Sequence, residues 1–248
     1  MGEQTRFDVE ILHEDDHLVA LAKPAGIAMH GGTGIPNEES LVEAVLGNFE
    51  IEEGFQGPAF LGRLDRQTSG LVLLALSQEG LNAVNRAYRE NHIVKDYLCV
   101  VHGRTEKHAH IRAPLPSRKE AKKKELEECH TEYETLLRGE RVSVLAVRLH
   151  TGRQHQIRRH MKAIGHPVIA DPRYGHRRKD EKLSRQARKN GMLLHSWRMH
   201  HELDISLPRE LEARIPQRFE KAMLACGIDL SEVMLPVPRL LGEEDTSN

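Results

Sequence analysis

The chain has 248 residues, of which 39% are hydrophobic and 29% charged, so it can bury the core of one large α/β domain or two small ones. No apolar run approaches the roughly 20 residues of a membrane helix, and the N-terminus lacks the basic-then-apolar pattern of a secretory signal. We therefore expect a cytoplasmic protein that does not bind membranes. Three scattered cysteines without a C-x-x-C pair argue against a disulfide framework and a thiolate zinc site.

The formal net charge of −1 argues against a protein that coats nucleic acid by charge alone. The charge is unevenly distributed, because residues 176–189 hold seven bases and two acids. A basic patch on a neutral body fits a protein that binds a particular structured RNA. The lysine run within residues 117–128 is either solvated surface or an arm that contacts phosphates.

The first predicted elements are a β-hairpin and a short helix. β-Branched and apolar residues surround a polar EDDH turn, which predicts a hairpin that ends at Lys23. A glycine-rich loop follows at residues 29–37, and Ser40 is a suitable N-cap for a helix over residues 41–49. The loop lacks the lysine and hydroxyl residue of a Walker motif, so a phosphate-binding loop is not expected.

The middle of the chain predicts a strand, a helix and a second strand. After the strand-like LVLLAL, Ser77 can cap a helix to about residue 91 that buries Leu81, Val84 and Tyr88 on one face. The following strand, residues 93–101, alternates. It places Lys95, Tyr97 and a core Cys99 on the same face.

Two further strands are predicted at residues 130–137 and 142–149, followed by a helix that begins near Gln154. That helix should bury a stripe of Ile157, Met161 and Ile164, with Arg158 at the edge of the stripe and able to reach inward.

The segment LGRLDRQTSG at residues 61–70 is the best candidate for a catalytic centre. It sets Asp65 close to Arg63 in a turn-rich stretch before a strand, where a carboxylate can meet a ligand. The same residues also fit a structural role, in which Asp65 caps a turn and Arg63 is its surface ion-pair partner. The segment alone does not decide between these two readings.

Five segments, in order, resemble motifs of the RluA-type pseudouridine synthases. GRLDRQTSG resembles the family's H-R-L-D-x-x-T-S-G. AKPAG at 22–26 resembles N-K-P-A-G, and VKDYLCVVHG at 94–103 resembles K-x-Y-x-x-x-V-x-G. TGRQHQIRRHMKAIGHPVIAD at 151–171 resembles G-R-x-H-Q-I-R-x-H followed by G-H-P-I-x-G-D, and LLHS at 193–196 resembles L-L-H-A.

Two departures from the family pattern matter for the site. Gly62 stands where the family has histidine, and Ala22 stands where it has asparagine, so those side-chain functions are absent or supplied otherwise. The RRH sequence at 158–160 and the basic stretch that follows Tyr174 are similar to the branch represented by tRNA pseudouridine synthase C.

The resemblance implies that the chain converts specific uridines of tRNA or rRNA to pseudouridine. Asp65 matches the family's catalytic aspartate, Arg158 the arginine that pairs with it, and Tyr97 the tyrosine that stacks on the target base. A buried aspartate needs such a cation to stay ionised, because burial alone favours the neutral acid. Whether Asp65 attacks the sugar, attacks the base or removes a sugar proton is left open.

The resemblance also implies a set of substrate-binding residues. Arg63 matches the arginine that helps displace the target nucleotide, and Leu194 matches the apolar contact beneath the base. Lys95 is either structural or a phosphate contact. The remaining candidates come from the 151–171 motif, namely Arg153, His155 and Gln156.

Two other classes of function were weighed against this hypothesis. A metal hydrolase is disfavoured because His13 and His17 lie across an expected hairpin, and His155 and His160 are poorly aligned on a helix. We expect neither a metal nor a cofactor. A non-catalytic RNA-binding or RNA-folding protein is favoured a little by Gly62 and disfavoured by Asp65, Tyr97 and Arg158 together.

The expected fold is a mixed α/β (α+β) pseudouridine synthase fold, with a large, mainly antiparallel sheet flanked by helices. We expect one catalytic domain over residues 1–240, with no S4-type module before it, and a disordered tail at 241–248. The expected partner is structured RNA rather than DNA, and the expected state is a monomer.

Overall fold

The structure is a computed structural model that describes residues 9–235 apart from residues 33, 35, 91, 117–125, 176–190 and 202–206. The predicted basic stretch at 176–189, most of the lysine-rich segment and the tail at 241–248 lie outside these residues. The described chain folds into two compact units. Unit 1 comprises residues up to Lys95 and Trp197–Arg214, and unit 2 comprises Asp96–Ser196 and Ile215–Leu235. The single domain over residues 1–240 stays a prediction.

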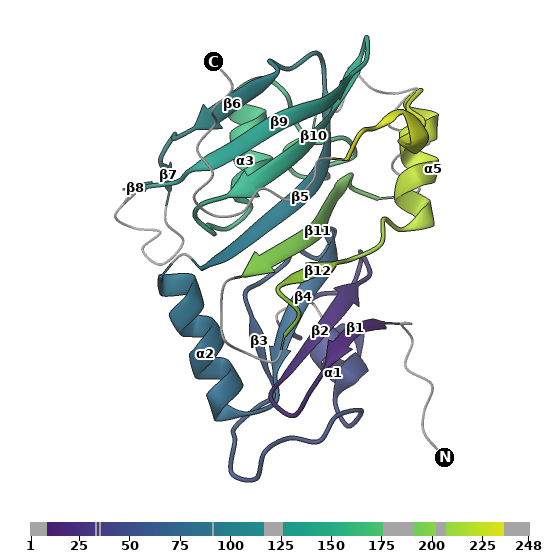
Figure 1. Cartoon of the computed structure of the whole chain (residues 1–248). Helices are drawn as coiled ribbons and strands as arrows, with labels where there is room; N and C mark the ends of the chain where they lie inside the picture. The colour runs from purple at the N-terminus through teal and green to yellow at the C-terminus, as the bar shows by residue number, and fades with distance from the viewer. Residues whose placement is uncertain are drawn as a thin grey trace. The chain divides into compact units, whose positions relative to one another are not determined.

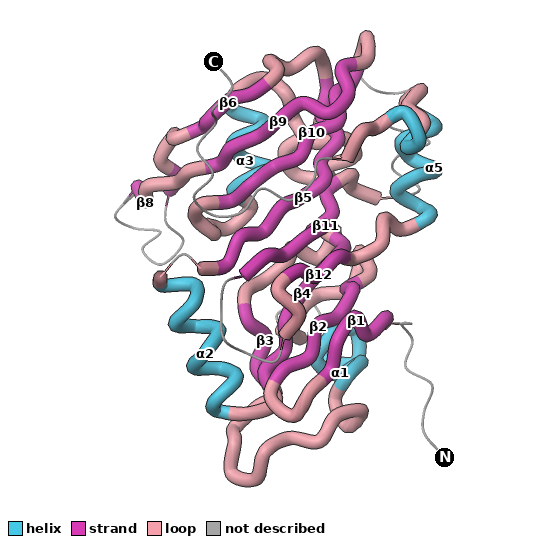
Figure 2. The backbone as a smooth tube through the Cα atoms, in the orientation of Figure 1, coloured by secondary structure: helices cyan, strands magenta, loops and turns pink. Residues whose placement is uncertain are grey.

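The predicted fold class is confirmed, because the strands form a large sheet whose described pairings between strands are antiparallel (Figure 1). Helices flank the strands in each unit, as the tube in Figure 2 shows by colour. In the part of the chain that the structure describes, no helix has the length and apolar character needed to cross a bilayer.

Unit 1 is built on the predicted hairpin. Strand β2 lies between β1 and β4 in antiparallel pairing, β3 pairs with β4, and β12 pairs with β11. The strands of unit 1 are β1 (Glu10–Glu14), β2 (Leu18–Lys23), β3 (Ala59–Leu61), β4 (Ser69–Ala75) and β12 (Glu210–Glu212), with β11 (Leu194–His201) shared between the units. Its helices are η1 (Asn37–Glu39), α1 (Leu41–Val45) and α2 (Gln78–Arg89).

Both predicted helix caps of unit 1 are confirmed. The Ser77 side chain accepts a hydrogen bond from the Gly80 amide, and the Ser40 side chain accepts one from the Glu43 amide. Helix α1 ends at Val45, earlier than predicted, because the chain turns at Leu46 and then at Gly47, whose φ is 84°.

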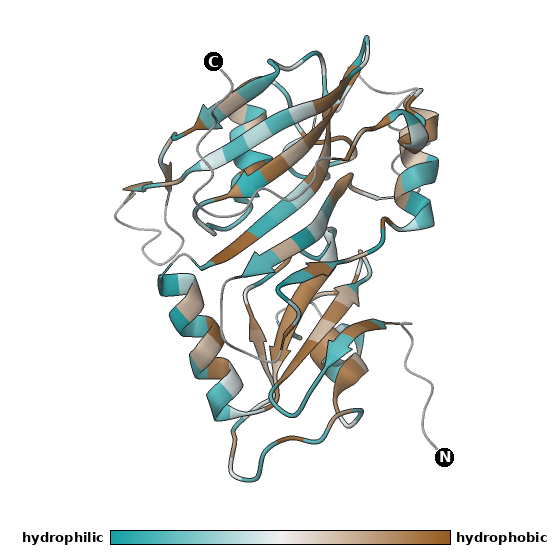
Figure 3. Ribbon diagram, in the orientation of Figure 1, coloured by the Kyte–Doolittle hydropathy of each residue, from teal (hydrophilic) through white to brown (hydrophobic). Residues whose placement is uncertain are grey.

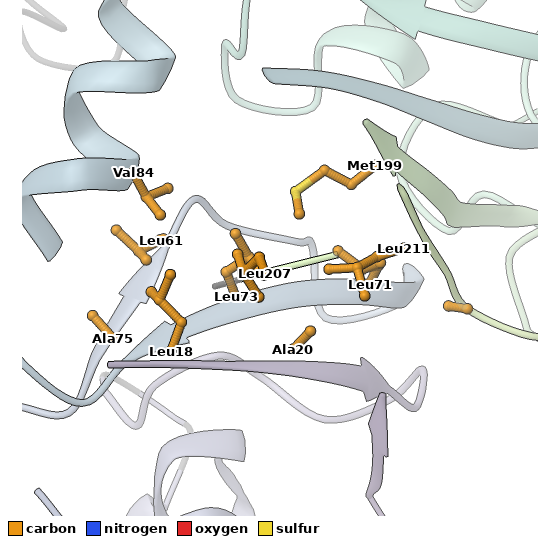
Figure 4. Packing of buried hydrophobic residues seen from close by; sticks show 11 residues of the cluster. Leu18, Ala20, Leu61, Leu71, Leu73, Ala75, Val84, Met199, Leu207 and Leu211 are labelled. Atoms are coloured by element: carbon orange, nitrogen blue, oxygen red, sulfur yellow. The ribbon is translucent and has the colours of Figure 1, made fainter. Parts of the chain in front are cut away.

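The core of unit 1 lies between α2 and the sheet, as Figure 4 shows. Val84 is fully buried there, while Leu81 and Tyr88 are partly buried against the same cluster, so the predicted apolar face of α2 is confirmed. The apolar stripe is visible along α2 in Figure 3. The strands contribute Leu18, Ala20, Leu71, Leu73 and Ala75 to this core.

Unit 2 carries the strands in the order β5, β10, β9 and β6. These strands are β5 (Ile93–His102, shared with unit 1), β6 (His108–Ile111), β9 (Thr131–Arg138) and β10 (Val142–Leu149), and a small sheet pairs β7 (Leu115–Pro116) with β8 (Leu126–Glu127). The helices are α3 (Gln156–Ala163), α5 (Gln217–Ala225) and η2 (Leu230–Glu232). The three strands predicted here are confirmed, and Cys99 is fully buried as expected.

Helix α3 begins at Gln156, slightly later than predicted. Ile157 and Met161 are buried as expected. The prediction for Ile164 is wrong, because this residue is the C-cap beyond the last helical turn and is 37% exposed. Arg158 is buried, so it lies within the packed face rather than at its edge.

Candidate active site

Asp65 lies in the loop between β3 and β4 of unit 1. Leu64 and Thr68 are buried on either side of it, while Asp65 itself stays partly exposed. The Thr68 amide donates a hydrogen bond to the Asp65 carbonyl at 3.0 Å, which closes the turn. The loop therefore anchors the neighbours of Asp65 in the core while Asp65 itself stays partly exposed.

A buried lysine holds this loop from the side. The Nζ atom of Lys23, whose residue is 1% exposed, donates to the carbonyls of Pro24, Ile27 and Arg66 at 2.8, 3.0 and 3.3 Å. The Gly26 amide also donates to the Arg66 carbonyl at 2.7 Å, and Arg66 Nε donates to the Gly26 carbonyl at 2.8 Å. The AKPAG segment thus fixes the main chain one residue after Asp65.

Arg63 is exposed on the same loop and lies close to His30. The pKa of His30 lies below its usual value because burial disfavours the charged ring and the Arg63 guanidinium repels it. The ring of His30 packs edge-on against Phe60 with centroids 5.6 Å apart. Arg63 is therefore an exposed cation at the rim of the Asp65 loop.

Gly62, at the position of the histidine in the family pattern, adopts a left-handed φ of 85°. A Cβ atom at Gly62 would lie 3.4 Å from both Lys95 Nζ and the Tyr88 hydroxyl. Lys95 Nζ lies 5.2 Å from the centroid of the Tyr88 ring. Among the described residues, the buried Tyr88 hydroxyl has no hydrogen-bond partner. Lys95 and Tyr88 thus fill the space beside Gly62.

In unit 2, Arg158 makes a buried, bidentate ion pair with Asp171. Arg158 Nε donates to Asp171 Oδ2 at 2.7 Å, and Nη2 donates to Oδ1 at 2.8 Å. The two side chains are 5% and 0% exposed. This fork geometry is the strongest form of the arginine–carboxylate pair, and it fixes the plane of the guanidinium.

Asp171 is held as an anion despite its burial. Burial by itself raises the pKa of Asp171, but the hydrogen bonds from Arg158 and from the Tyr174 and Arg173 amides outweigh it, so the pKa lies below its usual value. Ala170, just before it, has a left-handed φ of 58° at the position where the family pattern has glycine. The strained residue turns the chain so that Asp171 faces Arg158.

The loop that leads into α3 carries the other predicted residues of its motif. His155 caps α3 with a left-handed φ of 54°, and its Nδ1 lies 3.1 Å from the Tyr174 hydroxyl. A non-glycine residue in this region carries strain, which is common at functional sites. Arg153 is exposed and pairs with Glu127 at 2.8 Å.

Gln156 forms the inner support of that loop. Its amide nitrogen donates to the His130 carbonyl and to Thr131 Oγ1, and its oxygen accepts from Thr151 Oγ1 and the Arg153 amide. The side chain is buried. That Gln156 binds substrate stays a prediction, and its observed contacts are with the protein's own loop.

Tyr97 and Leu194 lie on adjoining parts of unit 2. Tyr97 is on β5 and is 6% exposed, and Leu194 begins β11 and is 4% exposed. The Val100 amide donates to the Leu193 carbonyl, and the Leu193 amide donates to the Ile169 carbonyl. The start of β11 is thereby tied both to β5 and to the segment that leads to Asp171.

The histidine pairs weighed as metal ligands have other partners. His13 contacts Asp15, His17 contacts Ser77, and His160 contacts Thr131 and the Ala113 carbonyl.

The structure therefore brings the predicted residues together in two groups. Arg63, Asp65 and Lys95 lie around one loop of unit 1, while Tyr97, Arg153, His155, Gln156, Arg158 and Leu194 belong to unit 2. The sequence reasoning missed Lys23, Asp171 and Tyr174. Lys23 and Asp171 lie inside quoted motifs, and Tyr174 follows the second motif by three residues. For Lys23 the available signal was a charged residue in the otherwise apolar AKPAG.

Comparison with known proteins places the chain in a family. The family model described as RNA pseudouridylate synthase matches residues 17–163. The chain therefore belongs to the RNA pseudouridylate synthase family.

Two relatives from Haemophilus ducreyi resemble this chain. Ribosomal large subunit pseudouridine synthase C is 31% identical over 220 residues, which is 86% of this chain and 66% of the relative. tRNA pseudouridine synthase C is 30% identical over 210 residues, which is 78% of this chain and 85% of the relative. The chain thus spans about two thirds of the first relative and most of the second.

Solved structures confirm the fold. Human RNA Pseudouridylate Synthase Domain Containing 4 superposes with a TM-score of 0.69 at 19% identity, covering 89% of this chain and 94% of that one. Human RNA Pseudouridylate Synthase Domain Containing 1 gives a TM-score of 0.65 at 22% identity, covering 87% and 85%.

Proposed function

We propose that the chain isomerises specific uridines in structured RNA to pseudouridine, with Asp65 as the catalytic carboxylate. The observation that carries this proposal is the Asp65 loop, which leaves a carboxylate partly exposed while Lys23 and Gly26 fix the main chain beside it. This loop lies within the part of the chain that matches the family model.

The reaction needs a carboxylate and no external group. The bond from the sugar C1′ to N1 of uracil breaks, the base turns and C1′ bonds to C5. The C5 proton leaves to solvent, and N1, freed from the sugar, takes up a proton. Asp65 supplies a nucleophile or base for an electron-poor carbon, and the atoms balance without oxidation.

Arg158 is proposed to keep Asp65 ionised when the base excludes water. The Asp171 fork uses Nε and Nη2 of Arg158. A guanidinium offers five donors in a fixed plane, so one arginine can serve two carboxylates. The pairing of Arg158 with Asp65 is part of the proposal.

The target base is proposed to leave its stack and to enter the site. Tyr97 would stack on the base and Leu194 would lie beneath it, which compensates the few kcal/mol that unstacking costs. Arg63 would fill the space left in the RNA, and Lys95, Arg153 and His155 would contact the RNA backbone. Gln156 is assigned to the same group and would act through the loop that it supports.

The substrate class follows the named relatives, so tRNA and rRNA are the two RNAs to test. We also propose that the chain acts as a monomer in the cytoplasm, without a membrane or DNA partner. Size-exclusion chromatography with light scattering tests the monomer directly.

A chemical map of pseudouridines tests the function. Unmodified total tRNA and rRNA are incubated with wild type, Asp65→Asn or the exposed control Asp16→Asn, and pseudouridines are mapped by reverse-transcription stops. We expect new sites with wild type and Asp16→Asn and none with Asp65→Asn. Equal maps from wild type and Asp65→Asn would remove Asp65 from the mechanism. RNA binding without new sites would favour the non-catalytic RNA-binding protein.

A further inference from the structure

Four histidines and a glutamate form a cluster on one face of unit 2. His108 and His110 lie two residues apart on β6, Glu132 lies on β9, and His130 and His150 lie just before β9 and just after β10. In the strand register His110 is opposite Glu132, and Glu132 is opposite Arg148. Because side chains alternate between the faces of a strand, all these side chains share one face.

This face is opposite to the one that carries Tyr97. In the strand register Tyr97 pairs with Val147, and Val147 pairs with Tyr133, so these three side chains share a face. Asp96 and Glu132, each one residue before a tyrosine of this row, lie on the other face. Tyr133 is buried, whereas His108 and His110 are exposed. The cluster is therefore separate from the catalytic group proposed above.

The cluster is held together by contacts between its own members. Glu132 Oε1 lies 3.0 Å from His108 Nε2, and Oε2 lies 2.9 Å from His150 Nε2. His130 Nε2 lies 3.1 Å from His110 Nδ1, and the rings of His130 and His150 stack with centroids 4.0 Å apart. The five side chains thus have defined mutual orientations.

We propose that His108, His110 and Glu132 form a binding site for a divalent transition-metal ion of the zinc class. Among the residues that the structure describes, these three offer one ligand atom each within 4.8 Å of one another. Zinc bonds of about 2.0–2.1 Å in a tetrahedral shell separate neighbouring ligand atoms by about 3.3 Å. Small rotations of exposed side chains close the remaining gap, and water completes the shell.

The surrounding residues support coordination. A ligand carboxylate or imidazole is usually fixed by a second hydrogen bond, and here His150 contacts Glu132 while His130 contacts His110.

The ion would join the β6 strand to β9. Strand β6 is paired to β9 along one side and is only four residues long, His108–Ile111. A metal bound by residues of both strands stabilises the folded state over the unfolded state by mass action, so it should raise the unfolding temperature.

Metal titration of the full chain tests the site. Chelator-treated protein is titrated with Zn²⁺ by calorimetry, and its unfolding temperature is measured with and without Zn²⁺. We expect one ion per chain and a higher unfolding temperature, with His108→Ala/Glu132→Gln binding about tenfold or more weakly. The matched control is His92→Ala/Glu90→Gln, which removes another exposed pair whose atoms lie 3.5 Å apart, and it should bind as wild type.

A spectroscopic measurement keeps the test independent of stability. Co²⁺ in place of Zn²⁺ should give the intense visible bands of a low-coordinate site with wild type and the control, but not with the cluster variant. Binding of Zn²⁺ by the cluster variant with wild-type stoichiometry and affinity would overturn the proposal. Absence of saturable Zn²⁺ binding by wild type would also overturn it.

Discussion

The Asp65 loop and the Arg158 helix both rely on a buried charge, but they use it differently. In unit 1 the buried charge is Lys23, which gathers main-chain carbonyls and leaves Asp65 partly exposed. In unit 2 the buried charge is Arg158 itself, bound in a fork to Asp171. In the first region the supporting residue and the proposed catalytic residue are therefore different, whereas in the second region Arg158 has both the supporting role and the proposed functional role.

The largest expected effect comes from breaking the Arg158 fork. Arg158→Ala removes the guanidinium that faces the buried Asp171 carboxylate, and Asp171→Ala removes the carboxylate that faces the buried guanidinium. Each should lower the free energy of unfolding by about 3–5 kcal/mol, measured by urea denaturation. A loss below about 1 kcal/mol for both variants would show that the fork is not a major support.

A double variant separates support from function in this region. Arg158→Met with Asp171→Leu replaces the ion pair by apolar side chains, which can restore much of the stability. We expect it to stay inactive, because the proposed partner of Asp65 is gone. Recovery of activity together with stability would make Arg158 a purely structural residue.

The next effect comes from the lysine of the other region. Lys23→Met keeps the length of the side chain but removes the donor to the Pro24, Ile27 and Arg66 carbonyls, so the free energy of unfolding should fall by about 1–3 kcal/mol. Activity should fall as well, because the chain beside Asp65 loosens. The exposed Lys107→Met is the matched control and should resemble wild type in denaturation and in activity.

A smaller effect is expected at Gly62, the left-handed position of the Asp65 loop. Gly62→His should destabilise the protein by about 1–2 kcal/mol, because histidine must adopt the left-handed φ of 85° and its ring must fit beside Lys95 and Tyr88. Gly62→Ala measures the backbone part alone. A more stable or more active Gly62→His variant would contradict the view that Lys95 and Tyr88 fill this space.

The smallest effect is expected at Ala170, the left-handed position beside Asp171. Ala170→Gly relieves the strain of a φ of 58° but gives the unfolded chain more freedom. The free energy of unfolding should stay unchanged or rise by up to about 1 kcal/mol. Thermal unfolding of Ala170→Gly, compared with wild type and with Ala170→Val, checks this, and the valine variant should be less stable than wild type. A clear loss of stability in Ala170→Gly would contradict the view that Ala170 is strained.

Local signals in the sequence predicted the elements that local chemistry determines. The hairpin of β1 and β2 follows from alternation, and α2 follows from the Ser77 cap and the spacing of its apolar residues. The exposure of Ile164 was not predicted, because periodicity gives no sign that the helix ends one residue earlier, at Ala163.

The supports of the site depend on contacts that sequence patterns do not encode. Lys23 reaches a carbonyl 43 residues away, and Asp171 meets Arg158 only because Ala170 turns the chain. The histidine cluster needs the register of β6 against β9, so no spacing along the chain could reveal it. The resemblance to the family motifs identified Asp65, Tyr97 and Arg158 as candidates, but it did not identify the residues whose contacts fix their positions.

Release of the C5 proton tests the central role of Asp65 most directly. RNA carrying tritium at C5 of its uridines loses the label to water only when C5 bonds to the sugar. Wild type should release tritium from a limited number of sites, while Asp65→Asn, with unchanged unfolding, should be slower by about 10⁴-fold or more. Release at comparable rates by both proteins would contradict the account.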